Sequence, residues 1–192
     1  MQSLLAEIRA CTHCAPVLPL GPNPIIAASG RTRVLLVSQA PGRLAHLSSV
    51  PFDDPSGRLL REWLDVDEPT FYDPDNFAIV PMGFCYPGKG KGGDLPPRPE
   101  CAEIWRGRLD ATLPDGAVKL LIGQYAQKYY LGGNRRRNLT ETVRDFAHYL
   151  PDFFPLPHPS PRNGIWQRKN PWFTETVVPA LREVVGPLIK RS

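Results

Sequence analysis

Hydrophobic residues occur along the chain in short continuous runs separated by amphipathic stretches. The clearest run covers residues 34–37 and stops at the Pro41-Gly42 turn. A continuous apolar run of this length is typical of a parallel strand that is buried on both faces. Further runs at 77–80, 118–122 and 153–156 indicate three more strands.

Amphipathic stretches between these runs predict helices at 3–10, 57–64, 101–112, 139–150 and 170–189, and another helix after the glycine turn that ends the third run. Thr140 is expected to cap the helix at 139–150, and Asn170 to cap the last helix, with Pro171 in its first turn. The alternation of strands and helices predicts the α/β class. We expect a three-layer α/β/α sandwich with a central, mostly parallel four-stranded sheet, formed by residues 1–192 as one domain.

Composition narrows the class of protein. The chain has 192 residues, a formal net charge of +4 and a sequence pI of about 9.0, which is compatible with a polyanionic partner. It has no apolar run of membrane length, and residues 1–9 resemble an amphipathic helix rather than a signal peptide. We therefore expect a cytoplasmic protein that contacts no membrane, and no obligate protein partner is evident.

Three loops follow the carboxyl ends of predicted strands, at 38–46, 81–93 and 157–163. In a parallel sheet such loops converge on one crevice, where ligands bind. Their polar side chains are of a kind that binds or stabilises an anion: Gln39, His46, Lys89, Lys91, His158, Ser160, Arg162 and Asn163. For any single loop, a proline-capped turn with solvated charges is the alternative interpretation.

Three motifs within this pattern resemble those of the uracil-DNA glycosylase superfamily: "SQAPG" at 38–42, "VPFDDPSG" at 50–57 and "HPSPRN" at 158–163. The family pattern is a Gly-Gln/Glu-x-Pro-Gly/Tyr loop, a Pro-Phe that stacks on uracil, and a His-Pro-Ser-x-x-Asn/Arg loop that enters DNA. "HPSPRN" is fairly specific, "QAPG" alone is weak, and the order of all three is the main argument. The resemblance covers roughly residues 3–185 and is greatest to the group known only as uracil-DNA-glycosylase-like proteins.

This resemblance implies an enzyme, a DNA glycosylase that hydrolyses the N-glycosidic bond of uracil or a related deaminated base in DNA. His158 would donate to uracil O2 and stabilise the departing anion, and Phe52 would stack on the flipped base. The resemblance also implies a catalytic role for Gln39. It implies substrate contacts at Ala40, Pro41, Gly42 and Gly83, and DNA contacts at Ser160, Pro161, Arg162, Asn163, Lys89 and Lys91. The alternatives are a loop histidine bonded to a backbone carbonyl for His158, and ordinary core for Phe52.

The chain also departs from the family pattern. The most active branch has a water-activating aspartate where this chain has Ala40, and the iron–sulfur branch has glutamate where it has Gln39. The uracil-reading asparagine has no counterpart at 80–84, which would alter the substrate or weaken the activity. Asp53 or Asp54 can supply a carboxylate to the site, although turn capping is a common role for such residues. We take Asp53 as the catalytic candidate.

The four cysteines form two pairs, Cys11-x2-Cys14 and Cys85-x15-Cys101. The second pair is too wide for a zinc ribbon. The spacing resembles the iron–sulfur branch of the superfamily, in which such a set holds a [4Fe–4S] cluster. The alternative is four reduced cysteines without a ligand.

Two other interpretations remain open on the sequence. A protein that kept the fold and the DNA groove could lack the chemistry, because Ala40 and the missing asparagine remove groups that the family uses. A nucleotide-binding role for "GKGKGG" at 88–93 is disfavoured, because no Lys-Ser/Thr opening a helix follows it. The basic stretch 134–138, "NRRRN", fits phosphate contact or a solvated loop.

Overall fold

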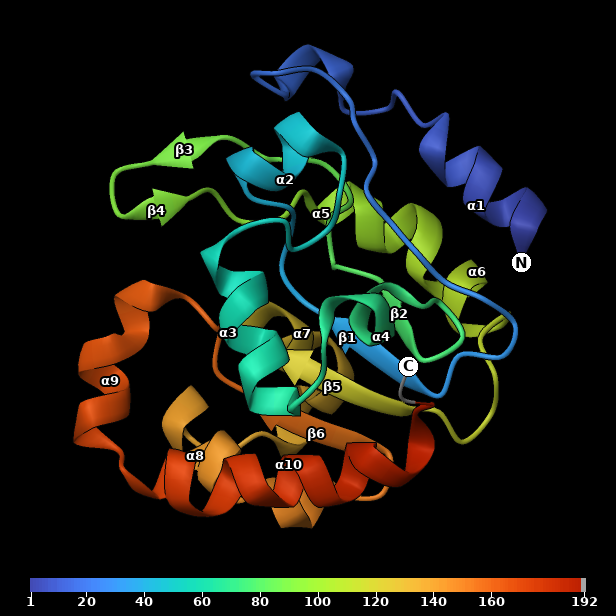
Figure 1. The fold of residues 1–192 in the computed structure, drawn as a ribbon. Helices are drawn as coiled ribbons and strands as arrows, with labels where there is room; N and C mark the ends of the chain where they lie inside the picture. The colour runs from blue at the N-terminus through green and yellow to red at the C-terminus, as the bar shows by residue number, and fades with distance from the viewer. Residues whose placement is uncertain (191–192) are drawn as a thin grey trace.

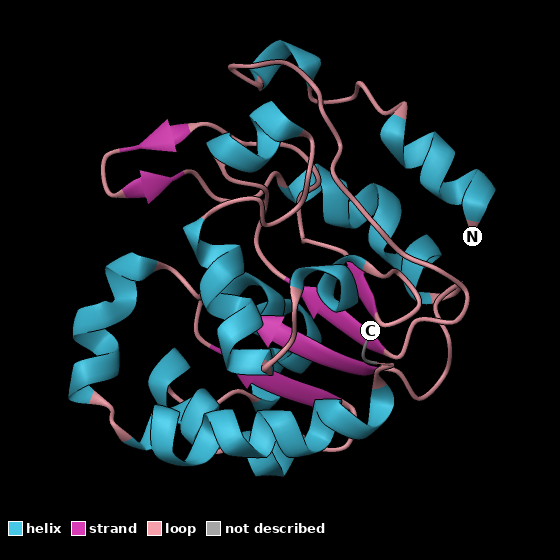
Figure 2. Cartoon of the chain, viewed as in Figure 1, coloured by secondary structure: helices cyan, strands magenta, loops and turns pink. Residues whose placement is uncertain are grey.

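The computed structural model describes residues 1–190, and a four-stranded parallel sheet forms the centre of this part of the chain. The strands are β1 (Val34–Val37), β2 (Phe77–Ile79), β5 (Val118–Ile122) and β6 (Phe153–Leu156), in the order β2-β1-β5-β6 (Figures 1 and 2). In register, Val34 lies between Phe77 and Val118, and Lys119 lies beside Phe153. The predicted fold class and sheet are confirmed.

Helices cover both faces of the sheet because side chains of a strand alternate between its faces. Val34 and Leu36 belong to one core, whereas Leu35 and Val37 belong to the other, and all four are fully buried. The first core is closed by α3 (Pro55–Leu64), α4 (Glu68–Tyr72), α8 (Leu139–Arg144) and α10 (Val178–Val185). The second is closed by α1 (Gln2–Arg9), α5 (Pro99–Cys101), α6 (Gly107–Asp110) and α7 (Gln124–Leu131).

Several elements of the structure were not predicted. The glycine-rich segment after β2 contains a small antiparallel hairpin, β3 (Lys89–Gly90) and β4 (Gly93–Asp94), which projects beside α2 (Arg43–Ser48) in Figure 1. A further helix, α9 (Gly164–Lys169), follows the last loop. Short 3-10 and π-helical turns make up the remaining helical elements: η1 (Ala15–Val17), η2 (Ala102–Arg106), η3 (Gly132–Asn134), η4 (Phe146–Tyr149), η5 (Pro161–Asn163), η6 (Phe173–Val177) and η7 (Gly186–Leu188).

Both predicted helix caps are wrong. Asn138, not Thr140, caps α8, because its side chain accepts a 2.9 Å hydrogen bond from Glu141 N, while Thr140 Oγ1 accepts one from Trp166 Nε1. Asn170 donates through Nδ2 to Trp166 O at 2.8 Å, so its side chain closes the end of α9 instead of opening the last helix.

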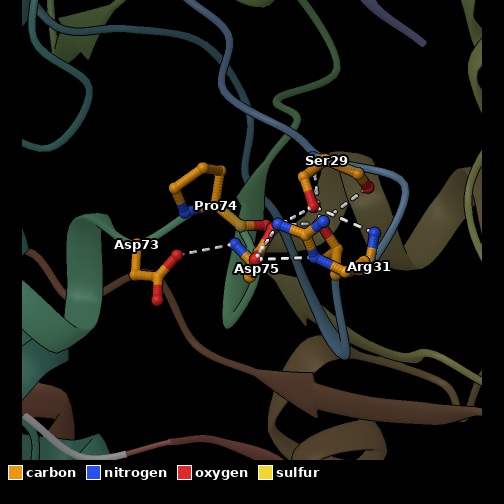
Figure 3. A network of polar contacts seen from close by, with 6 residues as sticks. Ser29, Arg31, Asp73, Pro74 and Asp75 are labelled. Atoms are coloured by element: carbon orange, nitrogen blue, oxygen red, sulfur yellow. Dashed lines mark hydrogen bonds and ion pairs between the residues drawn. The ribbon is translucent and has the colours of Figure 1, made fainter.

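A polar network fixes the chain where it enters β1 (Figure 3). Ser29 Oγ donates to Asp75 at 2.5 Å, and Arg31 reaches the same carboxylate through Nη2 at 2.6 Å. Thr32 Oγ1 donates to Pro74 O at 2.6 Å. These bonds join the segments that lead into β1 and β2, so the two strands enter the sheet side by side. Among residues 1–190 no helix is both long and apolar enough to cross a membrane.

Candidate functional site

The loops after β1 and β2 are joined to each other at the carboxyl edge of the sheet. Met82 N donates to Ser38 O at 2.8 Å, and Gly83 N donates to Gln39 O at 2.9 Å. Gly83 is buried and Gln39 half-buried. The two bonds extend the strand pairing into the loops, and they hold the first motif against residues 82–83.

His158 comes two residues after β6, on a loop that is fixed by its own side chains. Asn163 Nδ2 donates to His158 O at 2.8 Å, and Ser160 Oγ accepts from Arg162 N at 3.3 Å. A Cβ placed on Gly123, at the end of β5, would lie 3.8 Å from His158 Cβ. The proline-rich loop therefore presents the imidazole at the end of the two neighbouring strands.

Burial lowers the pKa of His158, and the nearby Asp54 carboxylate opposes this shift without cancelling it. A histidine with a lowered pKa is neutral at pH 7. A neutral imidazole has one N–H to donate, so His158 is suited to hydrogen bonding with an oxygen that gains negative charge.

Gln127 is a residue of this region that the sequence did not reveal. It lies on α7 and is 1% exposed. Its Nε2 donates to Leu121 O at 3.2 Å and to Leu156 O at 2.9 Å. One amide thus joins the ends of β5 and β6 directly below the loop that carries His158.

The carboxylate that faces the first motif is Asp54. Its Oδ1 accepts from Gly57 N at 2.9 Å and caps α3, and its Oδ2 lies 3.6 Å from where a Cβ on Gly42 would be. Asp53 is exposed and lies near Tyr72 instead. Because α3 begins at Pro55, the second of the two adjacent aspartates takes the capping position and turns toward Gly42.

Phe52 is 9% exposed and packs edge-on against Phe71, with 6.1 Å between ring centroids. Its backbone is left-handed, with φ of 57°. Gly57 makes this possible, because a Cβ there would lie 1.8 Å from Phe52 O. The ring lies in the first core at the edge of the crevice, and stacking on a base stays a prediction.

The basic residues of the predicted DNA surface separate into two groups. Arg162 is exposed, and its Nη1 lies 3.3 Å from where a Cβ on Gly93 would be, so the hairpin and the His158 loop meet. Lys89 and Lys91 are exposed on the same hairpin. The stretch 134–138 is different, because its arginines bond to nearby groups: Arg135 to Gly132 O, Arg136 to Asp145, and Arg137 to Glu141.

The four cysteines line one cavity, together with apolar residues that include Leu18, Phe84 and Trp105: Cys11, Cys14, Cys85 and Cys101. Burial, together with the other three thiols, raises the pKa of Cys85 to about 11, and burial also raises the pKa of Cys14 and Cys101. Deprotonated thiols crowded in this way are stabilised by a bound cation.

Four thiols around one cavity are the donor set that a [4Fe–4S] cluster uses. The chemistry of these residues fits such a group. In the described part of the chain, no group of three or more Cys, His, Asp or Glu side chains stands out as a site for a single metal ion.

The fold and the site define a three-layer α/β protein in which a neutral histidine lies near an aspartate at the carboxyl edge of a parallel sheet. Residues 26–182 match the family model of the uracil DNA glycosylase superfamily. The match spans β1 through most of α10 and includes all three motif loops. The chain belongs to the uracil DNA glycosylase superfamily.

Proposed function

We propose that this protein is a DNA glycosylase that removes uracil or a related deaminated base from DNA. The observation that carries the proposal is His158, neutral and held at the end of β6 by the Asn163 side chain, with the Asp54 carboxylate nearby. Breaking an N-glycosidic bond places negative charge on the departing base and positive charge on the sugar. The site offers a hydrogen-bond donor for the first and a carboxylate for the second.

His158 acts on the leaving group. As the C1′–N bond breaks, the electron pair moves onto the base, and an imidazole N–H aimed at the base oxygen stabilises that charge. A donor held in place before the reaction requires no reorganisation, which makes this kind of stabilisation large. The prolines that flank His158 and the bond from Asn163 supply that rigidity.

The loop that carries His158 also supports base flipping. A base inside the stack cannot reach the crevice, so the nucleotide is extruded and the gap is filled. Pro161 and Arg162 are exposed on the tip of this loop. We assign Pro161 to the gap and Arg162, with Lys89 and Lys91, to backbone phosphates.

Asp54 takes the role of the aspartate that the most active branch carries at the position of Ala40. It reaches the first motif from the cap of α3, because its Oδ2 lies 3.6 Å from where a Cβ on Gly42 would be. We assign it to positioning of the attacking water and to stabilising the positive sugar. No asparagine at 80–84 is present to recognise uracil. We therefore expect the protein to excise a range of deaminated bases rather than uracil alone.

We further propose that Cys11, Cys14, Cys85 and Cys101 hold a [4Fe–4S] cluster with a structural role. When bound, the cluster cross-links the segment after α1 to the loop after β2 and to α5. Arg98 and Glu100 lie beside it, with their side chains paired to each other and Arg98 near Cys14. Arg98, at the cap of α5, lines the cavity together with the four cysteines.

The experiment that tests the function is excision from oligonucleotides that carry uracil, hypoxanthine, xanthine or a thymine mismatch. Abasic sites are revealed by alkaline cleavage. We expect strand cleavage at one or more of these bases at saturating enzyme. Binding to the same oligonucleotides without any cleavage would instead identify a DNA-binding protein that has kept the fold and lost the chemistry.

A further inference from the structure

The β3–β4 hairpin reaches the candidate site, although the sequence predicted only a loop at 81–93. Its second strand ends at Gly93–Asp94. Gly93 packs against the guanidinium of Arg162, which belongs to the His158 loop. The hairpin therefore lies beside the loop that carries His158.

Asp94 places a second carboxylate beside Gly42. A Cβ on Gly42 would lie 3.6 Å from Asp94 Oδ2 and also 3.6 Å from Asp54 Oδ2. Two carboxylate oxygens from distant parts of the chain thus face the same small space above the first motif. A water molecule there has two acceptors for its two protons.

The charges around Asp94 come from three elements. Asp54 lies on the cap of α3, Arg162 on η5 and Lys89 directly across the hairpin. Tyr86, after β2, is also close, and Arg43 of α2 lies near that tyrosine. Burial is the main cause that raises the pKa of Asp94. The Arg162 guanidinium opposes this rise, Asp54 adds a smaller rise, and Lys89 lowers the pKa least, so the net shift is upward. Carboxylates with a raised pKa are suited to accept a proton near neutral pH.

We propose that Asp94 is a second catalytic carboxylate, which together with Asp54 binds and deprotonates the water that attacks the sugar. The proposal rests on the glycosylase function proposed above. It assigns a catalytic role to a hairpin residue that none of the three motifs contains.

The chemical step balances with these groups alone. The water oxygen forms a bond to C1′ as the C1′–N bond breaks, and the electron pair of that bond leaves on the base. One water proton passes to Asp94. The base anion, hydrogen-bonded to His158, later receives a proton, and Asp94 returns its own proton to solvent.

Single-turnover excision measured against pH tests this role. In the parent we expect the rate to fall as pH drops through the raised pKa of Asp94, because the protonated carboxyl cannot accept a proton. Asp94→Asn should lower the plateau rate by about 10²–10⁴-fold and remove this fall of the rate at low pH.

Asp115→Asn is the charge-matched control, since Asp115 is exposed in the turn before β5. Parent rates for Asp94→Asn at every pH would overturn the proposal and leave the glycosylase function standing.

Gly42→Ala tests the shared water without changing charge. Gly42 has φ of −77°, which alanine adopts freely, and its new methyl would meet both carboxylates at ordinary contact distance. We expect a folded variant with a rate as low as that of Asp94→Asn, because the methyl occupies the space of the water. Gly133→Ala, with open space around its Cβ, is the control. A parent-like rate for Gly42→Ala would contradict the shared water.

A measurement independent of excision separates this inference from the function it rests on. The titration of the Asp94 carboxyl, followed by carbon NMR, should shift to lower pH in Asp54→Asn, because a neighbouring negative charge has been removed. An unchanged titration would show that the two carboxylates do not interact, and it would overturn the proposal that Asp54 and Asp94 act together. A shifted titration in a protein that excises no base would refute the glycosylase function instead, and with it the catalytic role of the pair.

Discussion

At the residue scale, two side chains illustrate how position decides chemistry. His158 would be an ordinary loop histidine if it were solvated, but burial holds it neutral beside Asp54. Phe52 is packed in the core and has a left-handed backbone, which the absence of a side chain at Gly57 permits. The charge state of His158 and the backbone conformation of Phe52 are therefore set by neighbouring residues.

We expect His158→Ala to lower the single-turnover excision rate by about 10²–10³-fold, the usual effect of removing one donor to an oxyanion. Affinity for abasic DNA should change little, because the phosphate contacts remain. Excision at saturating enzyme separates the chemical step from binding. A variant as fast as the parent would assign the loop to DNA docking only.

Gly57→Ala should destabilise the fold by at least about 3 kcal/mol, because the new methyl collides with the Phe52 carbonyl and the backbone must move. The midpoint of urea unfolding measures this. Gly107→Ala is the control, since Gly107 is exposed and helical with open space around it; alanine there should stabilise by about 0.5–1 kcal/mol. Equal effects of the two variants would contradict the close approach at Gly57.

At the element scale, the site is assembled by loops that strands hold in place. Gln127 of α7 ties the ends of β5 and β6 together, and backbone bonds from Met82 and Gly83 tie the loops after β1 and β2. The His158 loop and the hairpin meet at Arg162 and Gly93. DNA that follows these elements would meet the exposed cations Lys89, Lys91 and Arg162 where the hairpin and the His158 loop meet.

Arg162→Ala should weaken DNA binding at every sequence and reduce the slope of log affinity against log salt by about 1, since one phosphate contact is lost. Fluorescence anisotropy across a salt series measures both quantities. Arg33→Ala, an exposed arginine immediately before β1, removes the same charge at the opposite edge of the sheet and should leave the slope unchanged. If both variants keep the parent slope, Arg162 does not contact a phosphate.

At the scale of the whole molecule, the cavity lined by the cysteines lies between segments of the chain that are outside the central sheet. Cys11 and Cys14 follow α1, Cys85 lies in the loop after β2, and Cys101 ends α5. A group bound to all four would stabilise the folded state, because it binds that state and not the unfolded chain.

Anaerobically purified protein should contain iron and sulfide and should absorb visible light. The Cys85→Ser variant should contain much less iron and sulfide than the parent and should absorb much less visible light. The variant should also unfold at a lower temperature than the parent, because the cross-link between α1 and the loop is weakened. Iron and sulfide assays with calorimetry measure these changes. Parent protein that is free of iron when purified without oxygen would show that the thiols carry no cluster.

The sequence by itself determined the sheet and most of the helices. The run at 34–37 is apolar at every position because β1 is buried on both faces, so the pattern identifies a central parallel strand without further information. The motifs at 38–42 and 158–163 directly follow predicted strands, so their convergence at one edge follows from the parallel arrangement. His158, Arg162 and Gly42 could therefore be assigned to one site in advance.

The tertiary structure alone decided which groups complete that site. Asp53 and Asp54 are identical in type and adjacent, and only the start of α3 at Pro55 turns the second one toward Gly42. The hairpin has two residues in each strand and is rich in glycine, so it leaves no alternating pattern to detect, and nothing local to Asp94 indicates that it lies beside Asp54. Gln127 looks like an ordinary helix residue until β5 and β6 present two carbonyls to it. Contacts between segments far apart in the chain depend on how the loops pack, and residue order does not encode that packing in any local pattern.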